Sequence, residues 1–300
     1  MSSDNDTPTP LPDGYEIRQL ELKHITWVQA IIAHTMSFDS PLWAGPDYVG
    51  DKTKRAYDMF AAIEPSAKEG IKSGLSYGVF QKNWKSRLDG TKEGGEVRWD
   101  PKDLSATEKD LLKQMDFPLV SVAITKRRRR EGEPKPQPPE GVTPWSDIVP
   151  LFATISGAFR TQEAKSAPPF ASPERIAQRS GTHTRSDFKK QRLMRALAHY
   201  VMDQLAREFD MVVIQSTSDS VTEVWEKPPL GYKATVTGVF DTAMYLVVGK
   251  DGKPYNPFGD AKVVCKKIWV DLKPGKGGEG SGGKSQAGSG LMAEESIHHD

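Results

Sequence analysis

The segment Arg179–Phe209, RSGTHTRSDFKKQRLMRALAHYVMDQLAREF, constrains the fold more than any other part of the chain. Its second half carries apolar residues at helical spacing, which form one stripe on a long helix: Leu193, Met194, Leu197, Val201, Leu205 and Phe209. A loop rich in lysine and arginine precedes this helix, and the apolar run MVVIQSTSD follows it as a predicted buried strand. A helix with one apolar face has to pack on a sheet in this context, so the segment predicts an α/β fold.

Strands and helices alternate along the rest of the chain. Alternating or continuous apolar runs predict strands at 14–22, 75–81, 96–100, 117–125, 211–219, 233–248 and 262–272. Helical spacing predicts helices at 25–36, 52–74, 104–115, 145–162, 193–209 and 220–227. Ser105 and Glu108 form a capping-box signature at the start of the third helix. We therefore expect a mixed α/β sheet flanked by helices, in one domain over residues 14–273.

Three segments are predicted to remain outside the packed structure. Residues 1–13 are polar and rich in proline, which predicts a disordered lead. Residues 126–144 begin with KRRRR and continue with many prolines, so we expect an exposed, disordered basic insertion. Residues 274–300 consist mainly of glycine, serine and lysine and predict a flexible tail.

Composition excludes several classes of protein. The net charge of +1 argues against a dedicated nucleic-acid binder. A single cysteine rules out an intramolecular disulfide framework, and with only six histidines we expect no metal site. No apolar run approaches the roughly 20 residues that span a bilayer, so no membrane association is expected. These features predict a cytoplasmic or nuclear protein.

The basic run Lys126–Arg130 has three interpretations. It is typical of a nuclear-localisation signal, or of a patch that contacts nucleic acid or another anionic surface. It is equally typical of a solvated charge run inside a disordered insertion. No aromatic residue lies within the run, which argues against base stacking.

The order of elements in the last third resembles the GNAT superfamily of acyl-CoA N-acyltransferases. In that family a strand leads into a loop of pattern Q/R-x-x-G-x-G/A, and a long helix follows. Here Lys189 stands at Q/R, Lys190 and Gln191 are the spacers, Arg192 replaces the first glycine, Leu193 follows it, and Met194 stands at the last position. The segment SVTEVWEKPPLGY resembles the short helix of the family, and GYEIRQLELKHITWVQAI its first strand and helix. DFPLVSVA, LMRALAHYVMDQ, VTEVWEKPP and IWVDL are similar to a fungal branch of the superfamily.

This resemblance implies a fold, a co-substrate and a reaction. The fold is a central mixed, mostly antiparallel sheet flanked by helices. The co-substrate is acetyl-CoA or another acyl-CoA, whose pyrophosphate binds the loop Lys189–Met194. Unsatisfied N–H groups and the positive end of a helix dipole favour an anion at such a site. The acyl group then passes to an amine acceptor by direct attack.

Two departures from the family pattern allow a second interpretation. Side chains at Arg192 and Met194 take the place of glycines, which let the backbone approach the phosphates closely. Arginine compensates in part because its guanidinium can pair with phosphate. Trp225 stands where many members carry a tyrosine that protonates the departing thiolate, and an indole N–H is no such acid. The alternative is a catalytically degenerate protein of this fold with a binding or regulatory role.

The remaining candidate residues lie next to this loop and on the short helix. His183 is the candidate general base, although a structural histidine at a strand end is the plainer interpretation. Thr182 and Thr184 alternate with it, so we expect them to point the other way, and we place them with Trp225 among the cofactor-binding residues. Glu223 is a tentative catalytic carboxylate.

Overall fold

The computed structural model describes residues 7–43, 50–130, 132–134, 136–166 and 172–274. The strands are β1 (Tyr15–Gln19), β2 (Tyr77–Gln81), β3 (Glu96–Val97), β4 (Met115–Asp116), β5 (Leu119–Arg127), β6 (Ile176–Thr184), β7 (Met211–Ser216), β8 (Lys233–Asp241), β9 (Val247–Val248), β10 (Pro254–Tyr255) and β11 (Val264–Asp271). The α-helices are α1 (Ile25–His34), α2 (Lys52–Ala62), α3 (Glu64–Lys72), α4 (Glu108–Lys113), α5 (Trp145–Ile148), α6 (Leu151–Ser166), α7 (Leu193–Ala206) and α8 (Asp219–Glu226). The described residues also form a π-helix, η2 (Thr35–Asp39), and several short 3-10 helices.

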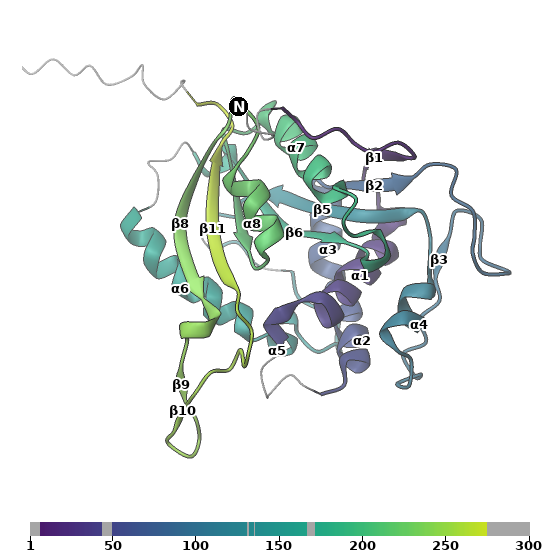
Figure 1. Cartoon of the computed structure of the whole chain (residues 1–300), viewed down its shortest axis with the longest axis horizontal. Helices are drawn as coiled ribbons and strands as arrows, with labels where there is room; N and C mark the ends of the chain where they lie inside the picture. Colours follow the sequence, from purple (N-terminus) through teal and green to yellow (C-terminus); the bar gives the residue numbers. More distant parts are fainter. Residues whose placement is uncertain (1–6, 44–49, 131, 135, 167–171, 275–300) are drawn as a thin grey trace, which may run out of the picture.

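One large sheet organises the described part of the chain (Figure 1). Its order is β1-β2-β5-β6-β7-β11-β8. Every neighbouring pair in it is antiparallel except β6 and β7, which run parallel. The predicted mixed, mostly antiparallel sheet is therefore confirmed.

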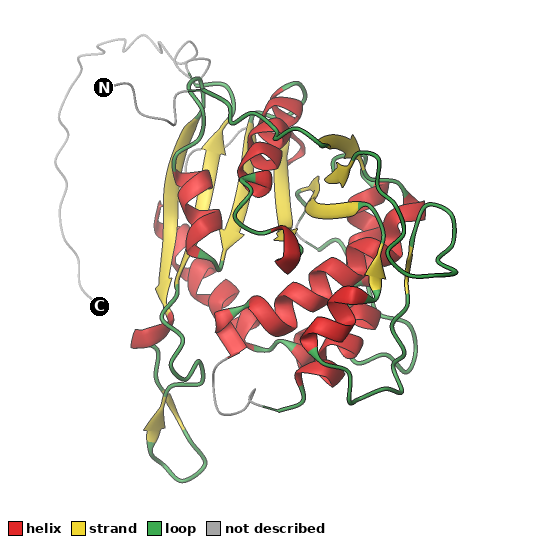
Figure 2. Cartoon of the chain, turned by 45° about the vertical axis from the view of Figure 1, so that its right-hand side comes forward, coloured by secondary structure: helices red, strands yellow, loops and turns green. Residues whose placement is uncertain are grey.

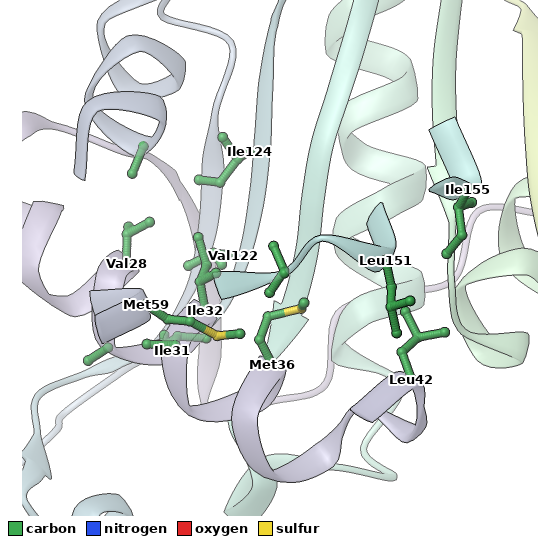
Figure 3. Close-up of a cluster of buried hydrophobic side chains, with 14 of the residues drawn as sticks. Val28, Ile31, Ile32, Met36, Leu42, Met59, Val122, Ile124, Leu151 and Ile155 are labelled. Atoms are coloured by element: carbon green, nitrogen blue, oxygen red, sulfur yellow. The ribbon is translucent and has the colours of Figure 1, made fainter. Parts of the chain in front are cut away.

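Helices cover both faces of the sheet (Figure 2). Each face has its own hydrophobic cluster. One cluster lies under α1, α2, α3 and α6; Figure 3 shows Val28, Ile32, Met36 and Leu151 of this cluster. The other lies under α7 and α8, and the apolar stripe predicted for the long helix supplies most of its helical side. Leu197 and Val201 are fully buried there, so the stripe packs on the sheet as expected.

Two prolines divide helices that the sequence predicted as continuous. The predicted helix 52–74 is split into α2 and α3, with Pro65 in the first turn of α3. The predicted helix 145–162 is split into α5 and α6 at Pro150. Proline has no N–H to donate to the carbonyl four residues earlier. It therefore interrupts a continuous helix, but it is tolerated in the first turn of a new one. The predicted capping box is also displaced, because Thr107 and Asp110 form it in place of Ser105 and Glu108.

The basic run is bound to the domain, contrary to the prediction of a disordered insertion. Strand β5 extends through Lys126 to Arg127. Lys126 and Arg129 both form ion pairs with Glu69 of α3, whose carboxylate has a pKa held low by these two cations against the opposing effect of burial. Arg127 and Arg130 pair with Glu208 and Glu174. The carboxylates facing the run explain why it is ordered where a sequence pattern predicts disorder.

Part of the predicted disordered lead also contacts the domain. The backbone N–H of Thr9 donates to Nδ1 of His199 on α7, 2.9 Å away, and Leu11 packs against the cluster under this helix. His199 is only 3% exposed, and burial lowers its pKa. The predicted tail 274–300 lies outside the described residues apart from its first position. None of the helices in the described ranges is long and apolar enough to cross a bilayer.

Candidate active site

The parallel strands β6 and β7 separate part-way along their length. They are paired from Ile176 opposite Met211 to Arg179 opposite Ile214. Beyond this point β6 stays paired with β5 and β7 stays paired with β11, so the sheet divides into two halves. A register shift between β5 and β6 leaves Ser180 without an opposite residue, which is a β-bulge at the place of separation. Residues 180–184 of β6 therefore have no strand partner on the side of β7, and we call the space beside this unpaired edge the gap.

Helix α7 begins close to this gap with an uncapped N-terminus. Its N-cap residue is Arg192, no side chain of the described residues caps it, and its first turn contains no acidic residue. The backbone of Arg192 is left-handed, with φ 59°, and so is that of Lys190, with φ 65°. A left-handed backbone is costly for residues other than glycine and persists where the surrounding structure imposes it. Arg192 therefore replaces a family glycine but keeps a glycine-like backbone.

Several contacts hold the loop between β6 and α7 in this conformation. Lys189 pairs with Asp39 at a distance of 2.8 Å, and the Ser186 hydroxyl donates to the same carboxylate. The Gln191 side chain accepts a 2.7 Å hydrogen bond from Tyr15. Lys189 and Gln191, predicted to bind phosphate, are therefore anchors of the loop here. The exposed Lys190 and Arg192 form no ion pair with any described residue.

His183 lies on β6 beside the gap, with a defined orientation. Its Nδ1 is 2.8 Å from the hydroxyl of Thr35. That hydroxyl has one proton and lies 2.8 Å from the carbonyl oxygen of Ile31, to which it donates, as threonine commonly does in a helix. It therefore accepts a hydrogen bond from the N–H at Nδ1, and the neutral ring carries its free lone pair on Nε2. A Cβ at Gly181 would lie 2.9 Å from Nε2, so this glycine leaves room for the ring.

The electrostatic environment keeps His183 neutral. Burial, reinforced by the positive charge of Arg179, lowers the pKa of His183 to about 4, and the negative charge of Asp39 only partly opposes this. The imidazole is therefore unprotonated at pH 7 and able to accept a proton.

The π-helix η2 supplies two residues that sequence reasoning missed. Thr35 orients His183, and Asp39 binds Lys189. Thr35 lies in the last turn of the predicted helix 25–36, and Asp39 lies three residues beyond it. π-Helical turns occur frequently at functional sites. Only their contacts across more than a hundred residues of sequence reveal this role.

Thr182 and Thr184 face the opposite side of the sheet from His183, as predicted. Thr182 pairs with Ala123, which belongs to the cluster under α7. Its hydroxyl accepts a hydrogen bond from Arg179, and the Thr184 hydroxyl is 2.7 Å from that of Ser121.

Solved structures of known proteins share this architecture. The chain matches no protein-family model and no curated protein sequence. The C-terminal condensation domain of Ebony in complex with beta-alanyl-dopamine is similar at a TM-score of 0.54 and 15% identity, covering 85% of this chain and 97% of that domain. Arylalkylamine N-acetyltransferase 2 from Aedes aegypti is similar at a TM-score of 0.51 and 11% identity, over 87% of this chain and 100% of its own. The chain has the GNAT fold.

Helix α8 follows β7 and is the short helix that the sequence resemblance identified. It carries Glu223 and Trp225. Glu223 is exposed and pairs with Arg195 in the first turn of α7, at a distance of 3.0 Å. Trp225 is fully buried, and the guanidinium of Arg179 lies 5.5 Å from its ring centroid. The structure thus brings Glu223 to the start of α7 and Trp225 to the point where β6 and β7 separate. Among the described residues, no group of three His, Cys, Asp or Glu side chains is arranged to hold a metal ion.

Proposed function

We propose that this chain is an acyl-CoA N-acyltransferase. The observation that supports this best is the separation of β6 from β7 after Arg179, followed directly by the uncapped N-terminus of α7. The left-handed backbone of Arg192 is the conformation that a glycine normally adopts in a phosphate-binding loop, and its guanidinium adds a donor that glycine lacks. The first turn of α7, which no side chain of the described residues caps, and the exposed Lys190 and Arg192 suit a pyrophosphate.

Different groups around the gap have different roles in the proposed reaction. Acyl-CoA supplies an activated thioester when it is bound. The first turn of α7 and Arg192 hold the pyrophosphate, which directs the thioester towards the gap. Backbone N–H groups of residues 180–184 polarise its carbonyl oxygen as the amine attacks. His183 accepts the proton that the amine nitrogen loses, through the Nε2 that Thr35 leaves unprotonated.

The acceptor we propose is a primary amine, and arylalkylamines are the first compounds to test. An arylalkylamine N-acetyltransferase and a domain solved in complex with beta-alanyl-dopamine are two similar structures whose length is covered almost completely by this chain. The neutral His183 can assist only an amine that reaches the gap in its unprotonated form.

Binding of CoA is the direct test of this function. Isothermal titration calorimetry should detect acetyl-CoA and CoA with micromolar dissociation constants. The matched control is pantetheine, the part of CoA that lacks the 3′-phosphoadenosine diphosphate. It should bind at least about a hundredfold more weakly because it has no anion for the α7 N-terminus. Absence of binding at millimolar acetyl-CoA and CoA would refute the proposal.

A non-catalytic acyl-CoA-binding protein is the second candidate function. The observation that favours it is the buried Trp225, which replaces a tyrosine able to donate a proton. The two functions differ in a measurable way, because a binding protein takes up acetyl-CoA but releases no free thiol when amines are added.

Replacing Arg192 with glycine tests whether the arginine side chain contributes to phosphate binding or obstructs it. We call the first case an adapted site and the second an impaired site. We expect Arg192→Gly to raise the free energy of unfolding by up to about 1 kcal/mol, since the left-handed backbone at φ 59° becomes unstrained. We expect CoA affinity to fall about tenfold through loss of one charge-assisted hydrogen bond. Denaturant titration and calorimetry measure the two effects.

The control for this experiment is the same substitution in the first turn of the helix. Arg195→Gly should lower the free energy of unfolding by about 1 kcal/mol, because Arg195 has ordinary helical geometry. A gain in CoA affinity for Arg192→Gly would contradict the adapted site and favour an impaired one.

A further inference from the structure

Arg179 is a buried arginine whose partners are all neutral. It is 4% exposed and lies at the last position where β6 pairs with β7. Its guanidinium donates to the carbonyl oxygens of Ile124 and Gly181, each 3.0 Å away, and to the hydroxyls of Thr125 and Thr182. No carboxylate of the described residues pairs with it, and burial lowers its pKa to about 9.

The other fully buried arginine on this segment shows the contrast. Arg185 is 1% exposed, and its Nε and a terminal nitrogen donate to both carboxylate oxygens of Asp187, at 3.1 and 2.8 Å. Burial of a cation is costly unless an anion is nearby. The fold provides that anion for Arg185 and provides none for Arg179.

Two N–H donors at Arg179 and Trp225 also lack acceptors. Nε of Arg179 and Nε1 of Trp225 are buried and have no hydrogen-bond partner among the described residues. The guanidinium carbon lies 5.5 Å from the indole centroid, so the two side chains are direct neighbours. Buried donors without acceptors are rare in folded proteins, and each needs an explanation. A positive charge and two free donors in one place are complementary to an anion.

We propose that Arg179 and Trp225 form an anion site at the point where β6 and β7 separate, and that it stabilises the sulfur of CoA as a thiolate. This inference rests on the proposed function. In the reaction the amine nitrogen bonds to the thioester carbonyl carbon, the carbon–sulfur bond breaks, and its electron pair stays on sulfur. The amine proton goes to His183, and Arg179 remains protonated throughout. Arg179 thus supplies by charge what a tyrosine supplies by proton transfer, and no acid is required at Trp225.

The pH dependence of CoA binding tests this site without any acyl transfer. Calorimetry between pH 6 and 8.5, where Arg179 with its pKa of about 9 stays charged, should show CoA binding more tightly as its thiol ionises. The bound thiol should titrate at least about one pH unit below the free thiol, a tenfold preference for the thiolate. Desulfo-CoA, which has no sulfur, should show no such rise. In Arg179→Met the preference should disappear while desulfo-CoA affinity stays within about twofold.

Two further variants complete the experiment. Trp225→Phe keeps the ring and removes only the N–H, so it should lose part of the preference, and it serves as the test if Arg179→Met does not fold. Arg175→Met is the matched control, because Arg175 pairs with Asp210 at the start of β6 and its loss should leave the preference intact.

The outcomes separate this proposal from the proposed function. An unchanged thiolate preference in both Arg179→Met and Trp225→Phe overturns the anion site, as does an equal loss of CoA and desulfo-CoA affinity, which indicates a purely structural role. Failure of the unsubstituted protein to bind either compound refutes the acyltransferase function itself.

Discussion

Replacing His183 with glutamine is expected to lower kcat by about 10²-fold, the lower end of the usual contribution of a general base, because a pKa of about 4 makes the imidazole a weak base. Glutamine fills the space of the imidazole and can still bond the Thr35 hydroxyl, but it cannot accept a proton. The measurement is release of free thiol from acetyl-CoA with the best arylalkylamine of a screened set. Affinity for CoA should stay within about twofold, because His183 lies on the face of β6 opposite Thr182 and Thr184.

The pH profile and a second variant identify His183 as the source of the effect. Because the pKa of His183 is about 4, this group limits the rate only when pH falls towards 4, where the ring becomes protonated. Thr35→Val removes the hydroxyl that fixes the tautomer and should lower kcat by about tenfold while retaining CoA binding. A kcat for His183→Gln within threefold of the unsubstituted protein would show that another group removes the proton.

The fold was largely predictable because its signals are local. The apolar stripe through Leu197 and Val201 and the apolar run of β5 depend on neighbouring residues in the sequence, and both pack as predicted. The errors at Pro65 and Pro150 concern local breaks that the tertiary structure accommodates with a second helix. The basic run was misjudged because its partner Glu69 lies 57 residues before Lys126 and carries no local signal.

The position of the candidate loop in the fold was predictable from the sequence, but its backbone conformation and its tertiary contacts were not. The loop Lys189–Met194 was placed correctly at the start of α7, since the order of strand, loop and helix is visible in the sequence. The left-handed backbone of Arg192 was not, because an arginine gives no sign of positive φ. The contacts of Thr35 with His183 and of Arg179 with Thr182 exist only in the folded sheet, so an ordinary threonine and one of many arginines gave no reason to single them out.

Asp116 is the residue whose loss should affect stability most among the contacts of this region. It is fully buried and accepts hydrogen bonds from Ser86 and Thr91 at 2.8 and 2.7 Å and from the backbone N–H groups of Arg87 and Leu88. Burial alone would raise the pKa of Asp116, but these hydrogen bonds outweigh it and lower the pKa to about 2. The carboxylate therefore holds the segment after β2, which forms one wall of a cavity of about 350 Å³ beside the β6–α7 loop.

We expect Asp116→Ala to lower the free energy of unfolding by about 3 kcal/mol, because several donors lose a charged acceptor at once. Since the folded pKa lies below the unfolded value of 3.8, the carboxylate contributes stability above about pH 4 and loses it as pH falls towards 2. Denaturant titration at pH 7 and pH 3 should therefore show a smaller difference between the two proteins at pH 3. Asp89→Ala, an exposed carboxylate in the same segment, is the control and should change stability by less than about 0.5 kcal/mol. An Asp116→Ala protein as stable as the control would contradict the role of this carboxylate, and unchanged hydrogen exchange over residues 82–95 would contradict its action on the segment.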